Sequence, residues 1–399
     1  MPDSISRLAR ALLVGFGLVA LGLAYWQVIR APSLLAREDN PRRVIAEQRV
    51  RRGQLLDRNG RALAYSEVLP ITALHDTVRR RYALPAAAHA VGYYSLRYGV
   101  GGAEAAFDVQ LRGQTNAWDG LLHRPAIGED VTLSLSWAAQ LAADRALGSA
   151  AGAVVALDIV SGEAWVMVSH PAYDPNRLDE DWEQLVADPN APLLNRSIQG
   201  LYPVGDLARL VGLAGLLSAG TTTPPDPFQA PLETMLAPLG RLGYLATARQ
   251  LGFDQAPIFD LPTAAGRLPD LDGKDTPRDL AVTPLHMARF AAAVARDGQL
   301  PRAWLLHPAP SAGAQRAFSP DVAAALRVVS PRRGDLAVWS GVATPKETGR
   351  APVSWLVGYG PAEAPRLALV VVVEGSSGGE LDTLPVAQHI WQILKEDAP

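Results

Sequence analysis

The sequence predicts a mixed α/β protein in which a central antiparallel sheet is flanked by helices and follows one membrane-spanning helix. Two pairs of apolar segments predict the sheet: 153–157 with 164–168, and 354–359 with 367–374. The short connection within each pair favours an antiparallel hairpin, and helical patterns border both pairs. An uncharged run near the N-terminus, 11–29, predicts the membrane helix.

The N-terminal run has the length and the flanks of a membrane anchor. Its 19 residues carry no charge. At 1.5 Å per residue they would span about 28 Å, close to the ~30 Å hydrocarbon core of a bilayer. Arg7 and Arg10 precede the run, and Tyr25 and Trp26 lie near its far end, where aromatic side chains favour the membrane interface. A cleaved signal peptide is the alternative, but the run is longer than a usual signal-peptide core. We therefore expect an uncleaved anchor and a single span.

Composition excludes several classes of function. The chain of 399 residues has 37 Lys and Arg against 40 Asp and Glu, a balance that argues against nucleic acid as the main partner. Cysteine is absent, which removes disulfides, thiol nucleophiles and cysteine-based zinc sites. The 7 histidines show no metal-ligand spacing. We expect no metal and no cofactor.

The remaining elements follow from turn and helix signals. The apolar pairs at 55–56 and 63–64 flank a turn, and the alternation at 132–136 predicts a half-buried strand. We expect Asp206 to cap a helix over about 206–217 that Gly220 closes. A short amphipathic stretch lies at 103–111, further helices are expected at 137–147, 241–251, 284–297 and 384–395, and a Thr- and Pro-rich loop at 221–231.

Several segments, taken together and in chain order, resemble the class B penicillin-binding proteins of bacterial cell-wall synthesis. The N-terminal ones are RGQLLDRNGRALA and GVGGAEAAFDVQLRG, at 52–64 and 99–113. The longest is AVVALDIVSGEAWVMVSHPAYDPN, at 153–176. The others lie at 128–136, 194–197, 202–205, 282–288, 355–360, 375–379 and 385–387. Many matches that follow the same order along most of the chain are far more specific evidence of the resemblance than any single match would be.

This resemblance implies an architecture and a location. It implies a membrane anchor at 1–30, a small β-rich non-catalytic domain at 31–127 and a transpeptidase-like domain at 128–399, related to the serine β-lactamases. The anchor would be single-pass, held in the membrane by residues 11–29, with most of the chain outside the cytoplasm. Cell-wall synthesis or division proteins would be its partners, and the peptidoglycan stem peptide its ligand.

The catalytic motifs of the family are where the sequence departs from it. The family uses Ser-x-x-Lys, Ser-x-Asn and Lys-Thr-Gly, in which the first serine is acylated and the first lysine takes its proton. Here Asp206 and Arg209 occupy the first serine and lysine positions. The chain has lysine only at positions 274, 346 and 395, and none of them completes Ser-x-x-Lys. No serine lies between Ser218 and Ser311 and no asparagine follows Asn195, so Ser-x-Asn is missing as well.

The third motif has two candidate positions. Trp339, Ser340 and Gly341 fit best on the strand that would carry it, and the stretch 346–349 is the alternative, which we interpret as the following loop. Trp339 either fills the former cleft or forms an exposed contact for a partner. We interpret Ser340 as a solvated strand-edge hydroxyl.

The resemblance with degenerate motifs leaves two functions open. The favoured one is a catalytically inactive homologue that acts as a scaffold, a regulator or a cell-wall binding protein. The alternative is an active D,D-transpeptidase or acyl hydrolase that uses relocated residues. The loss of a nucleophile and its base typically costs about 10⁶ in rate, which favours the inactive hypothesis.

Overall fold

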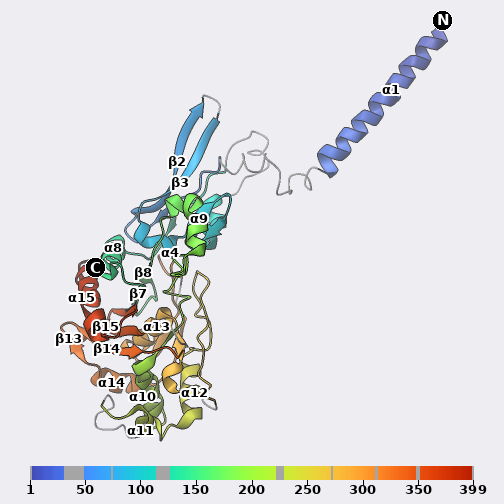
Figure 1. Ribbon diagram of the computed structural model, residues 1–399. Coiled ribbons are helices and arrows are strands. Elements are labelled where there is room, and N and C mark those ends of the chain that lie inside the picture. Colours follow the sequence, from blue (N-terminus) through green and yellow to red (C-terminus); the bar gives the residue numbers. More distant parts are fainter. Residues whose placement is uncertain are drawn as a thin grey trace.

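The core of the molecule is one antiparallel sheet of six strands in the order β13-β14-β15-β16-β7-β8 (Figure 1). The computed structural model describes residues 2–30, 49–72, 75–113, 126–221, 229–270, 273–310, 313–346 and 351–397. The sheet strands are β7 (Gly152–Asp158), β8 (Ala164–His170), β13 (Arg332–Arg333), β14 (Leu336–Ala343), β15 (Val353–Gly360) and β16 (Leu367–Glu374). The antiparallel sheet expected from the two strand pairs is confirmed.

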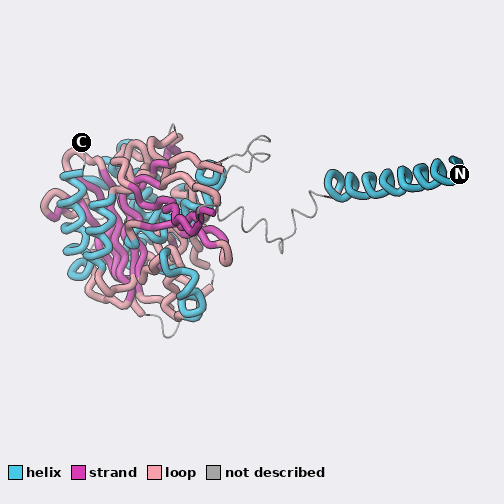
Figure 2. Tube along the Cα trace, turned by 90° about the horizontal axis from the view of Figure 1, so that it is seen from above, coloured by secondary structure: helices cyan, strands magenta, loops and turns pink. Residues whose placement is uncertain are grey.

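Helices cover both faces of this sheet, so its strands are buried on two sides. Figure 2 shows the strands enclosed between helices. Helix α13 (Pro284–Ala295) packs on one face, and α8 (Trp137–Leu147) and α15 (Glu380–Asp397) pack on the other. Alternate residues of one strand enter different cores: Trp355 and Val357 join the core under α13, whereas Leu356 joins the core under α15. This follows from the two-residue period of a strand.

The N-terminal part of the described chain forms a second, smaller sheet in the order β3-β2-β1-β6. Its strands are β1 (Leu55–Leu56), β2 (Ala62–Thr72), β3 (His75–Tyr82) and β6 (Val131–Thr132), and β2 with β3 forms a long projecting hairpin (Figure 1). The strand predicted at 132–136 is shorter in the structure. It ends early because Ser136 turns to cap α8, where its hydroxyl accepts from the Ala139 amide.

A buried charge cluster joins the two N-terminal motifs. Arg52 Nε and Arg80 Nε donate to the two oxygens of Glu104 at 3.0 Å and 2.6 Å, and Arg52 also donates to Asp108 at 2.6 Å. Glu104 is fully buried, and the two arginines supply the hydrogen-bond partners that a buried carboxyl group needs. The motifs at 52–64 and 99–113 therefore meet in space.

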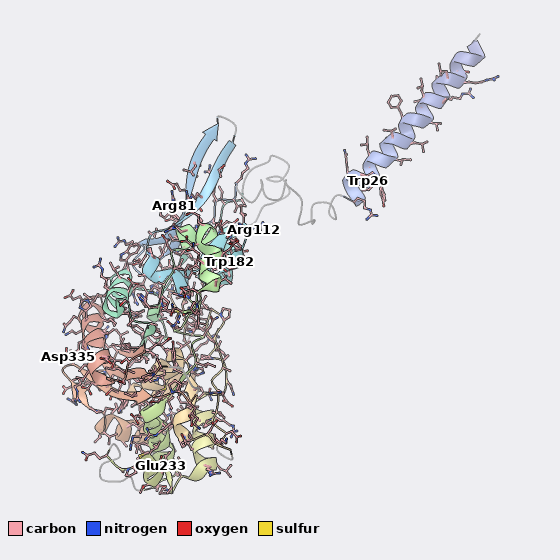
Figure 3. The ribbon with its side chains drawn as sticks, viewed as in Figure 1. Trp26, Arg81, Arg112, Trp182, Glu233 and Asp335 are labelled. Atoms are coloured by element: carbon pink, nitrogen blue, oxygen red, sulfur yellow. The ribbon has the colours of Figure 1, made fainter. Side chains whose placement is uncertain are left out.

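The N-terminal apolar run is helical. Helix α1 (Pro2–Ala24) continues as a π-helical turn, η1 (Tyr25–Ile29), and residues 6–27 are long and apolar enough to cross a membrane. No part of this span is buried by the described residues of the chain, and Trp26 lies at its far end (Figure 3). The polar and charged stretch that follows, 31–48, lies outside the described residues.

Shorter elements complete the chain. Around the N-terminal sheet lie η2 (Pro85–Ala87), α4 (Ala88–Val91), β4 (Tyr93–Ser95), β5 (Gly99–Gly101), α5 (Gly102–Ala106), α6 (Asp108–Arg112), η3 (Pro175–Arg177) and α9 (Leu178–Ala187). Beyond the sheet lie β9 (Tyr202–Pro203), η4 (Gly205–Leu207), α10 (Ala208–Ser218), α11 (Leu232–Leu236), α12 (Gly240–Gln250), η5 (Pro277–Asp279), β10 (Ala281–Val282), β11 (Gln299–Pro301), β12 (Ala314–Arg316) and α14 (Pro320–Val328).

Candidate active site

The turn η4 and the strand β14 meet at unusually close range, and this contact brings the predicted site residues together. Gly205 has φ +55, and a Cβ there would lie 2.2 Å from the Val342 carbonyl oxygen. A Cβ at Gly341 would lie 3.0 Å from Asp206 Cβ. Glycine is required at Gly205 both by the left-handed backbone and by the lack of space. The first and third motif positions are therefore neighbours, although 136 residues separate Asp206 from Val342.

Asp206 is held by two donors from two different elements. Its Oδ1 pairs with Arg278 Nη1 of η5, and its Oδ2 accepts from the Val342 amide of β14 at 3.4 Å. The Asp206 side chain is 44% exposed. The prediction that Asp206 caps the following helix is wrong. It is the second residue of η4, α10 begins only at Ala208, and the side chain makes no cap hydrogen bond.

Arg209 points to a different segment. Its Nη1 donates to the Ala230 carbonyl oxygen, just before α11 begins. Arginine stays protonated in proteins and cannot take a proton from a nucleophile. The position that would hold the base therefore carries a permanent cation engaged with backbone.

Trp339 is part of the hydrophobic core. It is 2% exposed, and its ring centroid lies 6.0 Å from Tyr359 and 6.5 Å from Phe290 of α13. Its indole Nε1 is buried and has no hydrogen-bond partner among the described residues. The alternative of an exposed partner contact is wrong, because the strand directs this ring into the domain.

Ser340 lies on the opposite side of β14 from Trp339 and is not simply solvated. Its Oγ donates to Glu380 Oε2 at 3.3 Å, at the start of α15. The Arg333 guanidinium hydrogen-bonds Glu380 and holds the pKa of that carboxyl below its usual range. A carboxylate of low pKa is a weak base, so this contact does little to activate the hydroxyl.

The alternative third motif is anchored elsewhere. Lys346 Nζ lies 2.8 Å from Asp279 and 3.2 Å from Asp275, and the hydrogen bond to Asp279 raises the pKa of Lys346. The amine is therefore protonated and directed at η5 rather than at Asp206. The other positions of this alternative, 347–349, lie outside the described residues.

A cavity of about 430 Å³ is lined by the segment that precedes η4, including Arg196 and Tyr202, and by Glu374 at the end of β16. Buried Arg196 donates to Glu374 Oε1 at 2.7 Å, and Tyr202 donates to the same oxygen at 2.6 Å. Burial, followed by the charge of Glu374, raises the pKa of Tyr202, so its hydroxyl stays protonated. These side chains are hydrogen-bonded to one another and hold the segment that leads into η4. The cluster contains no activated nucleophile.

Two participants in the site have no signal in the sequence. Arg278 is 72 residues from Asp206, and nothing in its surroundings marks it as the partner. Val342 contributes a backbone amide, which any residue would supply. Within the described part of the chain no group of three His, Asp or Glu side chains could hold a metal ion.

Comparison with known proteins finds a family similarity in the part of the chain that contains β14. Residues 235–392 match the penicillin binding protein transpeptidase domain. The match spans Trp339, Ser340 and Gly341 but begins downstream of Asp206 and Arg209.

Relatives extend the similarity to the whole chain. The chain is 29% identical to the peptidoglycan D,D-transpeptidase PbpA of Mycolicibacterium smegmatis over 95% of both chains. It is 28% identical to PbpA of Mycobacterium tuberculosis over 100% of both. A solved structure of M. tuberculosis penicillin-binding protein A as an imipenem acyl-enzyme complex aligns with TM-score 0.76 at 25% identity, covering 87% of this chain and 99% of that one.

These comparisons confirm the fold expected from the motifs. The similarity to the mycobacterial proteins named peptidoglycan D,D-transpeptidase PbpA extends over the full length of the chain. The α/β transpeptidase fold and the N-terminal β region match the expectations, as does the one apolar helix among the described residues that is long enough to cross a membrane.

Proposed function

We propose that this chain is a membrane-anchored pseudoenzyme of cell-wall synthesis, which acts as a scaffold or regulator rather than as a transpeptidase. The observation that carries the proposal is the pair Asp206 and Arg209 at the head of α10, in place of a nucleophile and its base. Asp206 is engaged by Arg278 and by the Val342 amide, and Arg209 by the Ala230 carbonyl.

The chemistry of acyl transfer supports this reading. A serine or comparable nucleophile must lose its proton to a nearby base before it attacks a carbonyl group. Arg209 cannot accept a proton at any physiological pH. Trp339 also supplies no cation for a substrate carboxylate, and such electrostatic stabilisation is usually a large share of catalysis.

An active enzyme with relocated residues is the rival function, because the full-length relatives are named as D,D-transpeptidases. Ser340 is the hydroxyl within the candidate third motif on β14. Its partner Glu380 is already paired with Arg333, which makes Glu380 a weak base. The rival hypothesis therefore lacks an activated nucleophile on β14.

The anchor and the partners follow from the ancestry. Residues 11–29 would hold the chain in the cell membrane, with the transpeptidase-like domain outside the cytoplasm. Cell-wall synthesis or division proteins are the partners that a scaffold on this fold would bind.

Labelling with a fluorescent penicillin tests the proposal. Membranes that contain the chain are incubated with the probe beside membranes that contain an intact homologue. We expect a labelled band for the homologue and none for this chain. Release of D-alanine from a pentapeptide donor is measured on the same samples, because an acyl hydrolase would give turnover without a stable band. Label or D-alanine release from this chain would favour the rival hypothesis.

A further inference from the structure

Hydrogen-bond donors from two elements converge at the junction of η4 and β14. Residues 338 and 342 are four apart on β14, so their amides point to the same side of the strand. The Val338 amide donates to the Pro331 carbonyl oxygen, on the side of β14 that faces β13, at 2.9 Å. The Val342 amide therefore points away from β15 as well, and it faces Asp206 Oδ2. Arg278 approaches the same carboxylate from η5. A strand-edge amide and a guanidinium aimed at one point form a site for a carboxylate.

The position of Arg278 is fixed by its own short helix. Asp279 accepts from the Thr276 amide at 2.7 Å and lies 2.8 Å from Lys346 Nζ, on the loop that follows β14. These contacts tie η5 to the end of the strand that supplies the Val342 amide. The two donors are thus held in place by groups other than Asp206.

We propose that Asp206 is the built-in occupant of this anion site and thereby excludes carboxylate ligands from it. The carboxylate belongs to the chain, so it competes with a dissolved carboxylate at high effective concentration. Its charge also repels any second anion that approaches Arg278. A peptide that ends in a free carboxylate is therefore rejected at this junction, and removal of the Asp206 side chain opens the site to it. The inference does not depend on whether the chain acylates a β-lactam.

The test follows the Val342 amide in the full chain. The protein is labelled with ¹⁵N-valine in detergent micelles, and the Val342 signal is identified as the one lost in Val342→Leu. Sodium acetate is titrated against sodium chloride at equal ionic strength, because salt alone weakens an exposed ion pair. We expect a saturable acetate shift in Asp206→Ala, at a midpoint that lies below that of the wild type by up to about fivefold, as the loss of a competing exposed ion pair implies.

Two further variants make the result specific. Asp206→Ala with Arg278→Gln removes one donor and should lose the acetate shift. Asp335→Ala is the matched control, because Asp335 is also an exposed carboxylate in an ion pair, with Lys395 at 2.9 Å, on another side of the domain (Figure 3). It should behave like the wild type. Unchanged circular dichroism of each variant shows that the fold is retained.

A second probe identifies the chemistry. N-acetyl-D-alanine should shift the Val342 signal in Asp206→Ala, whereas N-acetyl-D-alaninamide, which lacks the carboxylate, should not. Equal midpoints in the wild type and Asp206→Ala would overturn the proposal, as would the absence of a shift in Asp206→Ala. An acetate shift that persists without Arg278, or an equal response to the amide probe, would also overturn it.

Discussion

Replacing Trp339 by the lysine that the resemblance places there should destabilise the domain strongly. Trp339 is 2% exposed and packs among Phe290 and Tyr359. A lysine stem would fill part of the space left by the ring, but its ammonium group would be withdrawn from water without the partners that a buried charge needs. The apolar core around Trp339 therefore opposes a lysine at this position.

The magnitude follows from the protonation of the amine. A lysine in this core would be neutral at pH 7, and deprotonating an amine of pKa about 10.4 at that pH costs about 4–5 kcal/mol. Loss of ring packing adds about 1–2 kcal/mol, which is less than a full truncation to alanine. Trp339→Phe is the matched control. It loses some volume but also removes the buried indole Nε1 that has no partner, so it should cost about 1 kcal/mol.

The assay is urea unfolding of the full chain in detergent, for the wild type and both variants, at pH 7 and at pH 10. The folded state would hold the lysine neutral, so the unfolded state binds the extra proton below pH 10.4. The free energy of unfolding that Trp339→Lys loses relative to the wild type should therefore become smaller by about 1.4 kcal/mol per pH unit as the pH rises towards 10. A Trp339→Lys deficit no larger than that of Trp339→Phe, and independent of pH, would refute the buried placement of this side chain.

Three further predictions concern stability, catalysis and location. Burial lowers the pKa of His89 and of His286 from 6.5 to about 4 in the folded state. Below pH 6.5 the unfolded chain binds more protons at these histidines than the folded chain does. Their contribution to the free energy of unfolding should therefore be constant above pH 6.5 and fall by about 1.4 kcal/mol per pH unit for each histidine between pH 6.5 and pH 4. Denaturation at several pH values, for the wild type and for a variant with both residues changed to Gln, checks this slope. Asp206→Ser with Arg209→Lys should restore no release of D-alanine from a pentapeptide, because Trp339 and the missing Ser-x-Asn motif remain; release at even a few per cent of the rate of an intact homologue would show that the site is still competent. A C-terminal alkaline phosphatase fusion should be active and resist carbonate extraction, because we propose that the apolar span 6–27 anchors the chain; an inactive or fully extracted fusion would reject this topology.

Local patterns predicted the elements well. The helix expected at 137–147 is α8 with the same bounds, and the strands expected at 153–157 and 164–168 lie within β7 and β8. These signals are local, because a capping serine, a glycine turn and an apolar run each act within a few residues.

The surroundings of the site depend on contacts that no local pattern encodes. Strand β14 is buried on both faces over most of its length, so its apolar sequence could not show which way Trp339 points. Asp206 looked like a helix cap from its neighbours, but its partners Arg278 and Val342 lie 72 and 136 residues away. These groups come together only in the folded chain. The structure alone shows that the Asp206 carboxylate is already hydrogen-bonded to Arg278 and to the Val342 amide.

The most direct test of the central claim is intact-mass analysis of the purified full chain after long incubation with penicillin. The chain has no serine followed three residues later by lysine, and Asp206 stands at the position that the resemblance gives to the nucleophile. We predict that the mass of the denatured protein is unchanged, while an intact homologue treated in parallel gains one acyl group per chain. A stoichiometric mass gain on this chain that survives denaturation would contradict the account, and mapping the adduct would identify the nucleophile.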